Sequence, residues 1–159
     1  MYAARLWSVR HARFLSILYV AVERALIAAD PLCRFIGYAR LEAPVARLES
    51  AVKDFLFDCK MCGQCALSET GMSCPMNCPK SLRNGPCGGV RSDGTCEIVP
   101  TMRCVWVEAC SGRARMGLPA VAPVPNRPID HGSAGASSWL RVAREKSAAR
   151  RAAGNRTGR

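Results

Sequence analysis

Residues 59–65 read CKMCGQC and place three cysteines at intervals of three residues. Two successive two-residue gaps bring three thiols around one compact loop. Ferredoxin-type [4Fe–4S] sites use this run, together with a more distant cysteine followed by proline. Cys74 and Cys78 both precede proline here. A tetrahedral zinc site more often uses pairs of C-x2-C separated by a longer loop. The pattern therefore predicts a metal centre and favours iron–sulfur over zinc, but it does not choose between Cys74 and Cys78 as the fourth ligand.

Nine of the ten cysteines lie between residues 59 and 110. Cys87, Cys96 and Cys104 fit a second cluster, a structural zinc or buried thiols that pack as small hydrophobes. Because this segment has few large apolar residues, we expect metal ligation to supply folding free energy on the order of 10 kcal/mol per site. Cys33 stands alone in an apolar helical context and is predicted to be a packed thiol. The pattern assigns no role to Cys110.

The chain before the cysteines has helical periodicity. Residues 5–30 form an amphipathic pattern, which should end at Asp30-Pro31. One arc of that helix is apolar and contains Trp7, Phe14, Leu18, Val22, Ala25 and Ala29. Apolar residues also interrupt its polar side, which favours burial against a partner subunit over burial within this small chain. A second helix is expected to begin at Pro44, after a short helix or irregular segment. Its apolar stripe contains Val45, Leu48, Val52 and Phe55.

The last third of the chain differs in composition. Residues 111–159 hold ten of the 23 Lys and Arg residues and only two of the 12 Asp and Glu residues. They are rich in Pro, Gly, Ser and Arg, which predicts a flexible basic tail. The fold class expected is a small α plus irregular, metal-stabilised domain with a disordered basic tail. It comprises a partner-facing helical region (1–58), a cysteine-rich module with at most a short hairpin near Asp93-Gly94 (59–110) and the tail (111–159).

Several function classes are excluded by what the sequence lacks. At 159 residues the chain is too short for a (β/α)₈ barrel, which needs about 250. There is no Ser/His/Asp arrangement and no phosphate loop, so no catalytic residue is predicted. We find no secretory signal or membrane span, and dense cysteines in a cytoplasmic chain bind metal more often than they form disulfides. The tail lacks interleaved aromatic residues, so we do not expect specific nucleic-acid binding.

Residues 57–106 read FDCKMCGQCALSETGMSCPMNCPKSLRNGPCGGVRSDGTCEIVPTMRCVW. This segment closely resembles the C-terminal cysteine-rich domain associated with methylenetetrahydrofolate reductases, in its small-subunit (MetV-like) form. Its most distinctive part outside the cysteines is the Asn-Gly-Pro-Cys-Gly-Gly turn at residues 84–89. The resemblance implies eight metal ligands in two four-cysteine sites: Cys59, Cys62, Cys65, Cys74, Cys78, Cys87, Cys96 and Cys104.

The resemblance also implies a role in one-carbon (folate) metabolism. The chain would be an accessory, non-catalytic electron-transfer subunit of a methylenetetrahydrofolate reductase-type system, with one or two [4Fe–4S] clusters. Its expected partner is a separate flavin-dependent barrel subunit, and its expected location is the cytoplasm. The alternative is a zinc-binding structural or recruitment module for that partner or for a corrinoid-dependent methyl-transfer partner.

Overall fold

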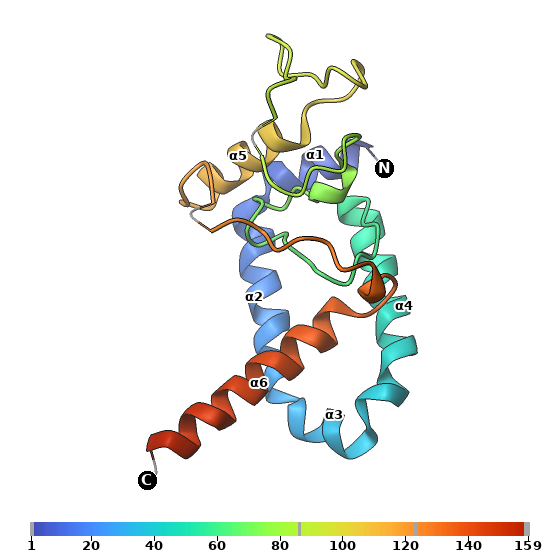
Figure 1. Cartoon of the computed structure of the whole chain (residues 1–159), viewed down its shortest axis with the longest axis vertical. Helices are drawn as coiled ribbons and strands as arrows, with labels where there is room; N and C mark the ends of the chain where they lie inside the picture. The colour runs from blue at the N-terminus through green and yellow to red at the C-terminus, as the bar shows by residue number, and fades with distance from the viewer. Residues whose placement is uncertain (1, 86, 123, 158–159) are drawn as a thin grey trace.

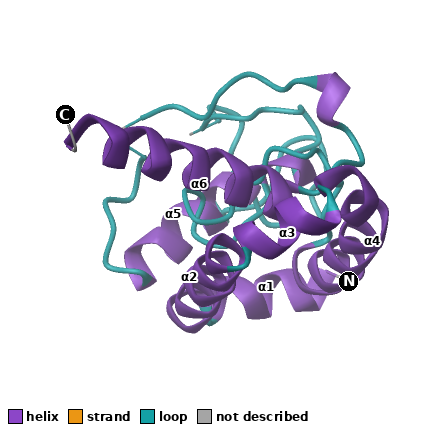
Figure 2. Ribbon diagram, turned by 90° about the horizontal axis from the view of Figure 1, so that it is seen from below, coloured by secondary structure: helices purple, strands orange, loops and turns teal. Residues whose placement is uncertain are grey.

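The computed structural model describes residues 2–85, 87–122 and 124–157, and their regular structure is helical. The α-helices are α1 (Tyr2–Arg10), α2 (Ala12–Ala28), α3 (Asp30–Ile36), α4 (Tyr38–Phe57), α5 (Val105–Arg115) and α6 (Ser138–Thr157). Two short 3₁₀ turns, η1 (Pro75–Asn77) and η2 (His131–Ser133), lie in the connecting segments. Within the described ranges there is no strand (Figure 2). The combination of helices with an irregular cysteine-rich segment is therefore as predicted.

Helices α2 and α4 form the two long sides of the molecule, and α3 joins them at one end (Figure 1). Helix α1 packs against α4 and α5 at the other end, where the cysteine-rich loops lie. Helix α6 crosses in front and contacts α2, α3 and α4. Segments distant in the sequence thus enclose the loop that follows α4.

The N-terminal helices begin and end at different residues from those predicted. The single helix expected over residues 5–30 is two helices, interrupted at His11 (φ −102°, ψ 24°). As predicted, it ends just before Asp30-Pro31, and a short helix, α3, follows. Helix α4 begins directly after Gly37, whose φ is +96°, so Pro44 lies inside the helix rather than at its start. Helix α4 accommodates this proline although it lacks the N–H that would donate to residue 40.

Helix α4 exposes much of its apolar stripe and buries a charged pair instead. Leu48, Val52 and Phe55 are 61%, 40% and 68% exposed. By contrast, Glu49 and Lys53 are only 1% and 2% exposed. Hydrophobic pattern alone cannot predict this orientation, because the buried pair is stabilised by polar partners that come from α6.

The disordered tail expected after residue 110 is not confirmed. Helix α5 continues to Arg115, and residues 138–157 form α6. Leu140, Ala143 and Ser147 are buried on one face of α6, and that helix packs on α2. Small and apolar residues three to four positions apart give this polar segment a face that tertiary packing stabilises.

The short hairpin allowed near Asp93-Gly94 is reduced to isolated bridges. Val90 pairs with Cys96 and Thr95 pairs with Arg103, both antiparallel. The Arg91 N–H donates to the Thr95 carbonyl at 3.0 Å. Among the described helices, none has the length and apolar character needed to cross a membrane.

Candidate metal centre

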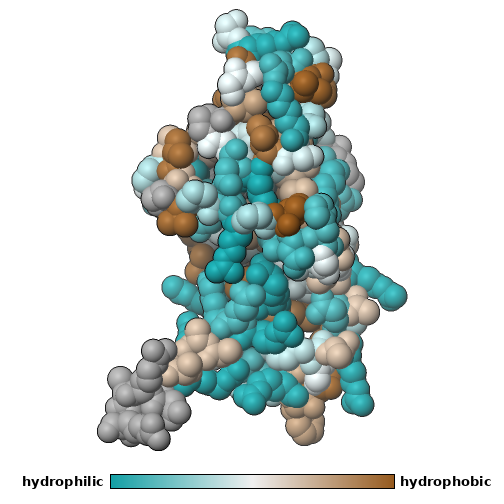
Figure 3. Space-filling view, viewed as in Figure 1, coloured by the Kyte–Doolittle hydropathy of each residue, from teal (hydrophilic) through white to brown (hydrophobic). Residues whose placement is uncertain are grey.

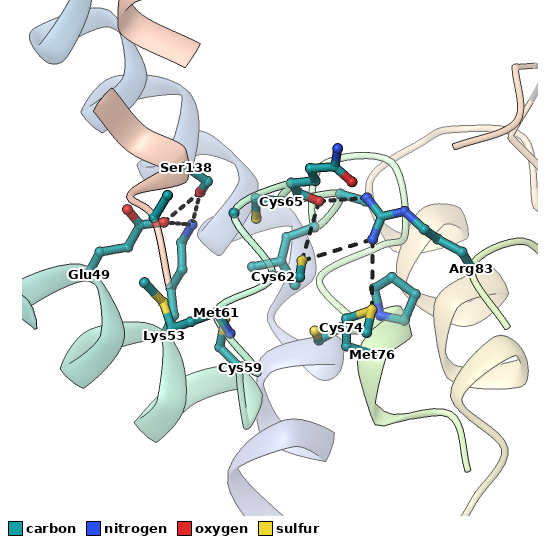
Figure 4. A pocket seen from close by; sticks show the side chains of 16 residues that line it. Glu49, Lys53, Cys59, Met61, Cys62, Cys65, Cys74, Met76, Arg83 and Ser138 are labelled. Carbon is teal, nitrogen blue, oxygen red and sulfur yellow. Dashed lines mark hydrogen bonds and ion pairs between the residues drawn. The ribbon is translucent and has the colours of Figure 1, made fainter. Parts of the chain in front are cut away.

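Four of the predicted ligands line one pocket: Cys59, Cys62, Cys65 and Cys74. Helix α4 ends at Phe57, and Asp58, Met61 and Gly63 have φ values of +51°, +42° and +69°. These left-handed residues turn the chain back on itself, so that the CKMCGQC loop curls around the pocket. Cys74 enters from the segment before η1, next to Pro75 (Figure 4).

The thiols of this pocket already interact with one another and with the backbone. The Met61 N–H donates to Cys59 Sγ at 3.4 Å, and the Cys62 thiol donates to the Gln64 carbonyl at 3.6 Å. Donation by the Cys74 thiol lowers the pKa of Cys59 to about 7, although burial alone would raise it. The same contact, with burial, raises the pKa of Cys74. Hydrogen bonds to sulfur and a thiolate at neutral pH both suit metal ligation.

A buried ion pair borders the same pocket. Lys53 Nζ lies 2.6 Å from Glu49 Oε1 and 2.8 Å from Ser138 Oγ. Glu49 also accepts from the Ser137 hydroxyl (2.6 Å) and from the Trp139 N–H (3.1 Å). Burial alone would raise the pKa of Glu49, but Lys53 and these hydroxyls outweigh it and lower that pKa. The carboxylate therefore stays charged at neutral pH.

The segment before α6 covers the cysteine loop. The Gly135 N–H donates to the Met61 carbonyl at 2.8 Å, and Arg141 Nε donates to the Gly63 carbonyl at 2.9 Å. At Gly63 a β carbon would lie 2.1 Å from the Ser133 carbonyl oxygen, so only glycine permits this approach. Residues that composition assigned to a free tail thus close one side of the pocket.

Arg83 adds a second positive charge near the thiols. Its Nη2 donates to the Gln64 carbonyl at 2.7 Å, and its Nη1 lies 3.9 Å from Cys62 Sγ (Figure 4). Its Nε donates to the Arg127 carbonyl at 2.8 Å, which ties it to the covering segment.

The other four predicted ligands lie elsewhere. Cys78 and Cys104 belong to a hydrophobic cluster with Trp106, and Cys87 packs against that cluster. Cys96 is buried beside it, with its N–H donating to the Met102 carbonyl at 2.9 Å. The Gly89 N–H donates to Cys87 Sγ at 3.4 Å, which repeats the contact made at Cys59. The structure therefore brings the first four predicted ligands to one pocket and places the other four outside it, with Cys78, Cys87 and Cys104 at a shared hydrophobic cluster.

The remaining two cysteines belong to neither group. Cys33 is buried in α3, where the sequence predicts a packed thiol. Cys110 lines a separate cavity with Trp106 and Arg113. All ten cysteines are free thiols.

The donor set fits a four-thiolate centre, although the sulfur atoms are not yet in ligating positions. Among the residues that the structure describes, no three His, Cys, Asp or Glu side chains are close enough together to hold a metal ion. The pocket that the four cysteines help to line measures about 20 Å³. It has room for one ion or water, and a cubane would require the loop to move outward. The chemistry of the donor set fits a metal centre. Four thiols line one pocket, and a backbone N–H and two cationic side chains lie beside them.

Comparison with known protein families shows which family this chain belongs to. The family described as methylene-tetrahydrofolate reductase C terminal matches residues 38–130, which is more than half of the chain. The chain belongs to this family. No curated protein and no solved structure gives a match. The matched range of this reductase C-terminal domain contains α4, both cysteine groups and α5, and it stops before α6.

Several residues at the site escape sequence reasoning. Glu49 and Lys53 have the spacing of an ordinary exposed helical ion pair. Ser137 and Ser138 lie in a segment whose composition indicates disorder. One indirect signal exists. The chain offers few elements that could bury the apolar stripe of α4, which is compatible with burial of another face of that helix.

Proposed function

We propose that this protein is the accessory iron–sulfur subunit of a methylenetetrahydrofolate reductase-type system, with a [4Fe–4S] cluster on Cys59, Cys62, Cys65 and Cys74. The observation that carries the proposal is that Cys74, the cysteine before Pro75, lines the same pocket as the CKMCGQC loop. The combination of a C-x2-C-x2-C run with a Cys-Pro is typical of ferredoxin-like sites. Membership of the reductase C-terminal family supports the same assignment.

The second group, Cys78, Cys87, Cys96 and Cys104, is the candidate for a further site. The N–H contact to Cys87 Sγ supports this, because the first group has the same contact at Cys59. A cluster bound at either position supplies one-electron transfer, with a potential set by charge, hydrogen bonds to sulfur and burial. The chain's own part is to hold the thiolates and to exclude water.

The exposed apolar residues of α2 and α4 support docking on a flavin-dependent barrel subunit. Phe14, Ile17, Leu48 and Phe55 are each more than half exposed. Large exposed apolar side chains on two long helices of a small protein suit an interaction site. In contrast, the face over which α6 runs is mainly hydrophilic (Figure 3).

A second candidate has its own supporting observation. The cavity of about 20 Å³ is closer in size to a single zinc ion than to a cubane, so zinc would require less outward movement of the loop. The chain would then be a zinc-stabilised structural or recruitment module for the same reductase or for a corrinoid-dependent methyl-transfer partner.

The two candidates are separated by metal analysis of anaerobically purified protein. We expect a brown protein with iron and acid-labile sulfide and a reducible electron paramagnetic resonance signal. Added to the flavoprotein barrel subunit, the reduced chain should reduce flavin, whereas the chain alone should not turn over methylenetetrahydrofolate. A colourless protein with stoichiometric zinc would replace the first proposal with the second.

A further inference from the structure

We infer that Lys53 is the buried cation that balances the negative charge of a four-thiolate centre at Cys59, Cys62, Cys65 and Cys74, and that Glu49 and the first turn of α6 position it. This inference rests on the proposed function only in requiring that the pocket bind a metal. A zinc ion or a [4Fe–4S]²⁺ cluster with four thiolates carries the same net charge of about −2.

The burial of Lys53 needs an explanation. Lysine is almost never fully buried unless it is paired, because removing an ammonium from water is costly. Lys53 is 2% exposed, and its ammonium is held between two aromatic rings. Nζ lies 5.5 Å from the centre of the Tyr19 ring and 5.2 Å from that of Trp139. Both rings attract a cation through their π faces.

Glu49 does not account for the whole environment of Lys53. The carboxylate takes three neutral donors, Ser137 Oγ, Ser138 Oγ and the Trp139 N–H, in addition to the ammonium. Its charge is therefore spread over several partners. The Lys53 side chain lies between Glu49 and the cysteines and lines the thiol pocket (Figure 4). The positive end of the pair is thus the one nearer the metal site.

The protonation of Lys53 is consistent with this arrangement. Burial alone would lower the pKa of Lys53, but the neighbouring Cys65 side chain and the Glu49 carboxylate outweigh it and raise that pKa. The residue therefore remains a fixed cation at neutral pH. A fixed positive charge in a site of low dielectric stabilises added negative charge, whether it arrives with thiolates or with an electron.

Helix α6 supplies the positioning. Ser138 Oγ accepts from Lys53 Nζ and donates to Glu49 Oε1, so it bridges the pair. Ser137 and Trp139 hold the other carboxylate oxygen. Ser137, which directly precedes α6, and Ser138 and Trp139 at the start of α6 thus hold the charge pair on α4.

The test uses the full chain, reconstituted anaerobically with iron and sulfide, and follows its reduction by redox titration with electron paramagnetic resonance. Glu49→Gln removes the negative charge alone and should raise the midpoint potential. Glu49→Gln with Lys53→Met removes both charges and should lower it below wild type, by about tenfold in the reduction equilibrium, or about 59 mV for one electron. The single variant Lys53→Arg keeps the positive charge, so its midpoint potential should match that of wild type. Lys60→Met removes an exposed lysine of the same loop and is the matched control.

A parallel titration with Zn²⁺ alone, in competition with a chelator, covers the case in which no cluster forms. The double variant should then bind zinc about tenfold more weakly than wild type and than Lys60→Met. If the double variant does not fold, Glu49→Gln with Lys53→Gln replaces it, because both amides can keep hydrogen bonds. Metal bound with unchanged potential and unchanged zinc affinity in these variants would overturn the inference and leave the proposed function intact. A wild-type chain that binds neither metal would overturn both.

Discussion

Gly71 and Gly112 meet backbone to backbone, and this contact joins the segment that leads to Cys74 to helix α5. A β carbon at Gly112 would lie 1.9 Å from the Gly71 carbonyl oxygen. Gly71 itself has a φ of +58°. The approach is therefore closed to any larger residue on either side, and it packs the segment that leads to Cys74 against α5.

Replacing Gly112 with alanine should destabilise the fold. The added methyl meets main chain that cannot rotate away, so we expect a loss of about 1–3 kcal/mol in the free energy of unfolding, despite the better helix propensity of alanine. Urea unfolding followed by circular dichroism measures it. Gly88→Ala is the control, because a β carbon there meets nothing within 4 Å. Equal stability of the two variants would show that α5 does not sit against Gly71.

Truncating Leu140 tests whether α6 is a packed element of the domain. Leu140 is buried where α6 lies on the rest of the molecule, so Leu140→Ala should cost about 2–5 kcal/mol. It should also speed alkylation of the cysteines by iodoacetamide, because α6 follows the segment that covers their loop. Arg144→Ala, at an exposed position of the same helix, should stay within about 0.5 kcal/mol of wild type. A tail free in solution would give no difference between the two.

The acid stability of the chain should depend on Asp30. This buried carboxylate accepts from the Tyr38 hydroxyl at 2.6 Å and pairs with Arg151 of α6. Donation by Tyr38, supported by Arg151 and Arg34, lowers the pKa of Asp30. A lowered pKa gives stability that is present above the carboxyl's ordinary pKa of about 4 and is lost as the pH falls through the folded-state value.

Asp30→Asn should therefore flatten the acid limb of the stability curve below about pH 4, where wild type loses this contribution. Chemical denaturation at a series of pH values measures the slope. Asp93→Asn is the comparison: the pKa of Asp93 is also lowered, so this variant should flatten the same limb, but to a smaller extent because Asp93 lies in an exposed turn bonded to Thr95. If the pH dependence of the unfolding free energy is the same in Asp30→Asn as in wild type, the Asp30–Arg151 pair does not help to hold α6 in place.

One physical difference separates the features that the sequence predicts from those that it does not. Spacing is a local property, so the x2 gaps of the CKMCGQC loop, the break at Asp30-Pro31 and the turn at Asp93-Gly94 can all be read directly from the sequence. The position of Cys74 beside the first loop depends on contacts between residues far apart in the sequence. The close approach of Gly71 to Gly112 is one such contact, and sequence periodicity does not predict it.

Helix α4 shows what periodicity leaves out. Its apolar stripe is clear, but the pattern does not reveal that Glu49 and Lys53 are buried, because their partners come from residues 137–139. Composition hides those partners, since two serines in a basic, glycine-rich region suggest a solvated tail. A buried polar network is specified by complementary groups far apart in the chain, and single-sequence patterns do not contain that information.

The two cysteine groups should lose metal independently. Cys62→Ala or Cys74→Ala should empty the first site alone, and Cys78→Ala or Cys87→Ala should affect only the second. Iron, sulfide and zinc content of each purified variant measures this. Cys33→Ala should keep all metal and cost about 1–2 kcal/mol of stability as a small core truncation. Metal loss in Cys33→Ala, or loss from both sites in every variant, would break the division into groups.

The exposed face of α4 should matter for assembly and not for folding. Phe55→Asp places a charge on a residue that already faces solvent, so stability should change by less than about 0.5 kcal/mol. Binding to the flavoprotein barrel subunit should weaken at least tenfold by calorimetry, because the charge would be desolvated in the complex. Lys60→Asp on the exposed loop serves as the charge control. Wild-type affinity in Phe55→Asp would move the interface elsewhere.

The segment that covers the cysteine loop is made after the loop itself. Cys59 to Cys74 leave the ribosome before Ser137 exists, and at about 5–20 residues per second the interval is roughly 3 to 13 s. During that interval the residues that cover one side of the loop are absent. Biosynthesis therefore offers a loading window that closes when α6 docks. We expect nascent chains stalled at residue 130 to take up metal faster than completed chains that folded without it, which pulse-labelled cell-free synthesis can measure.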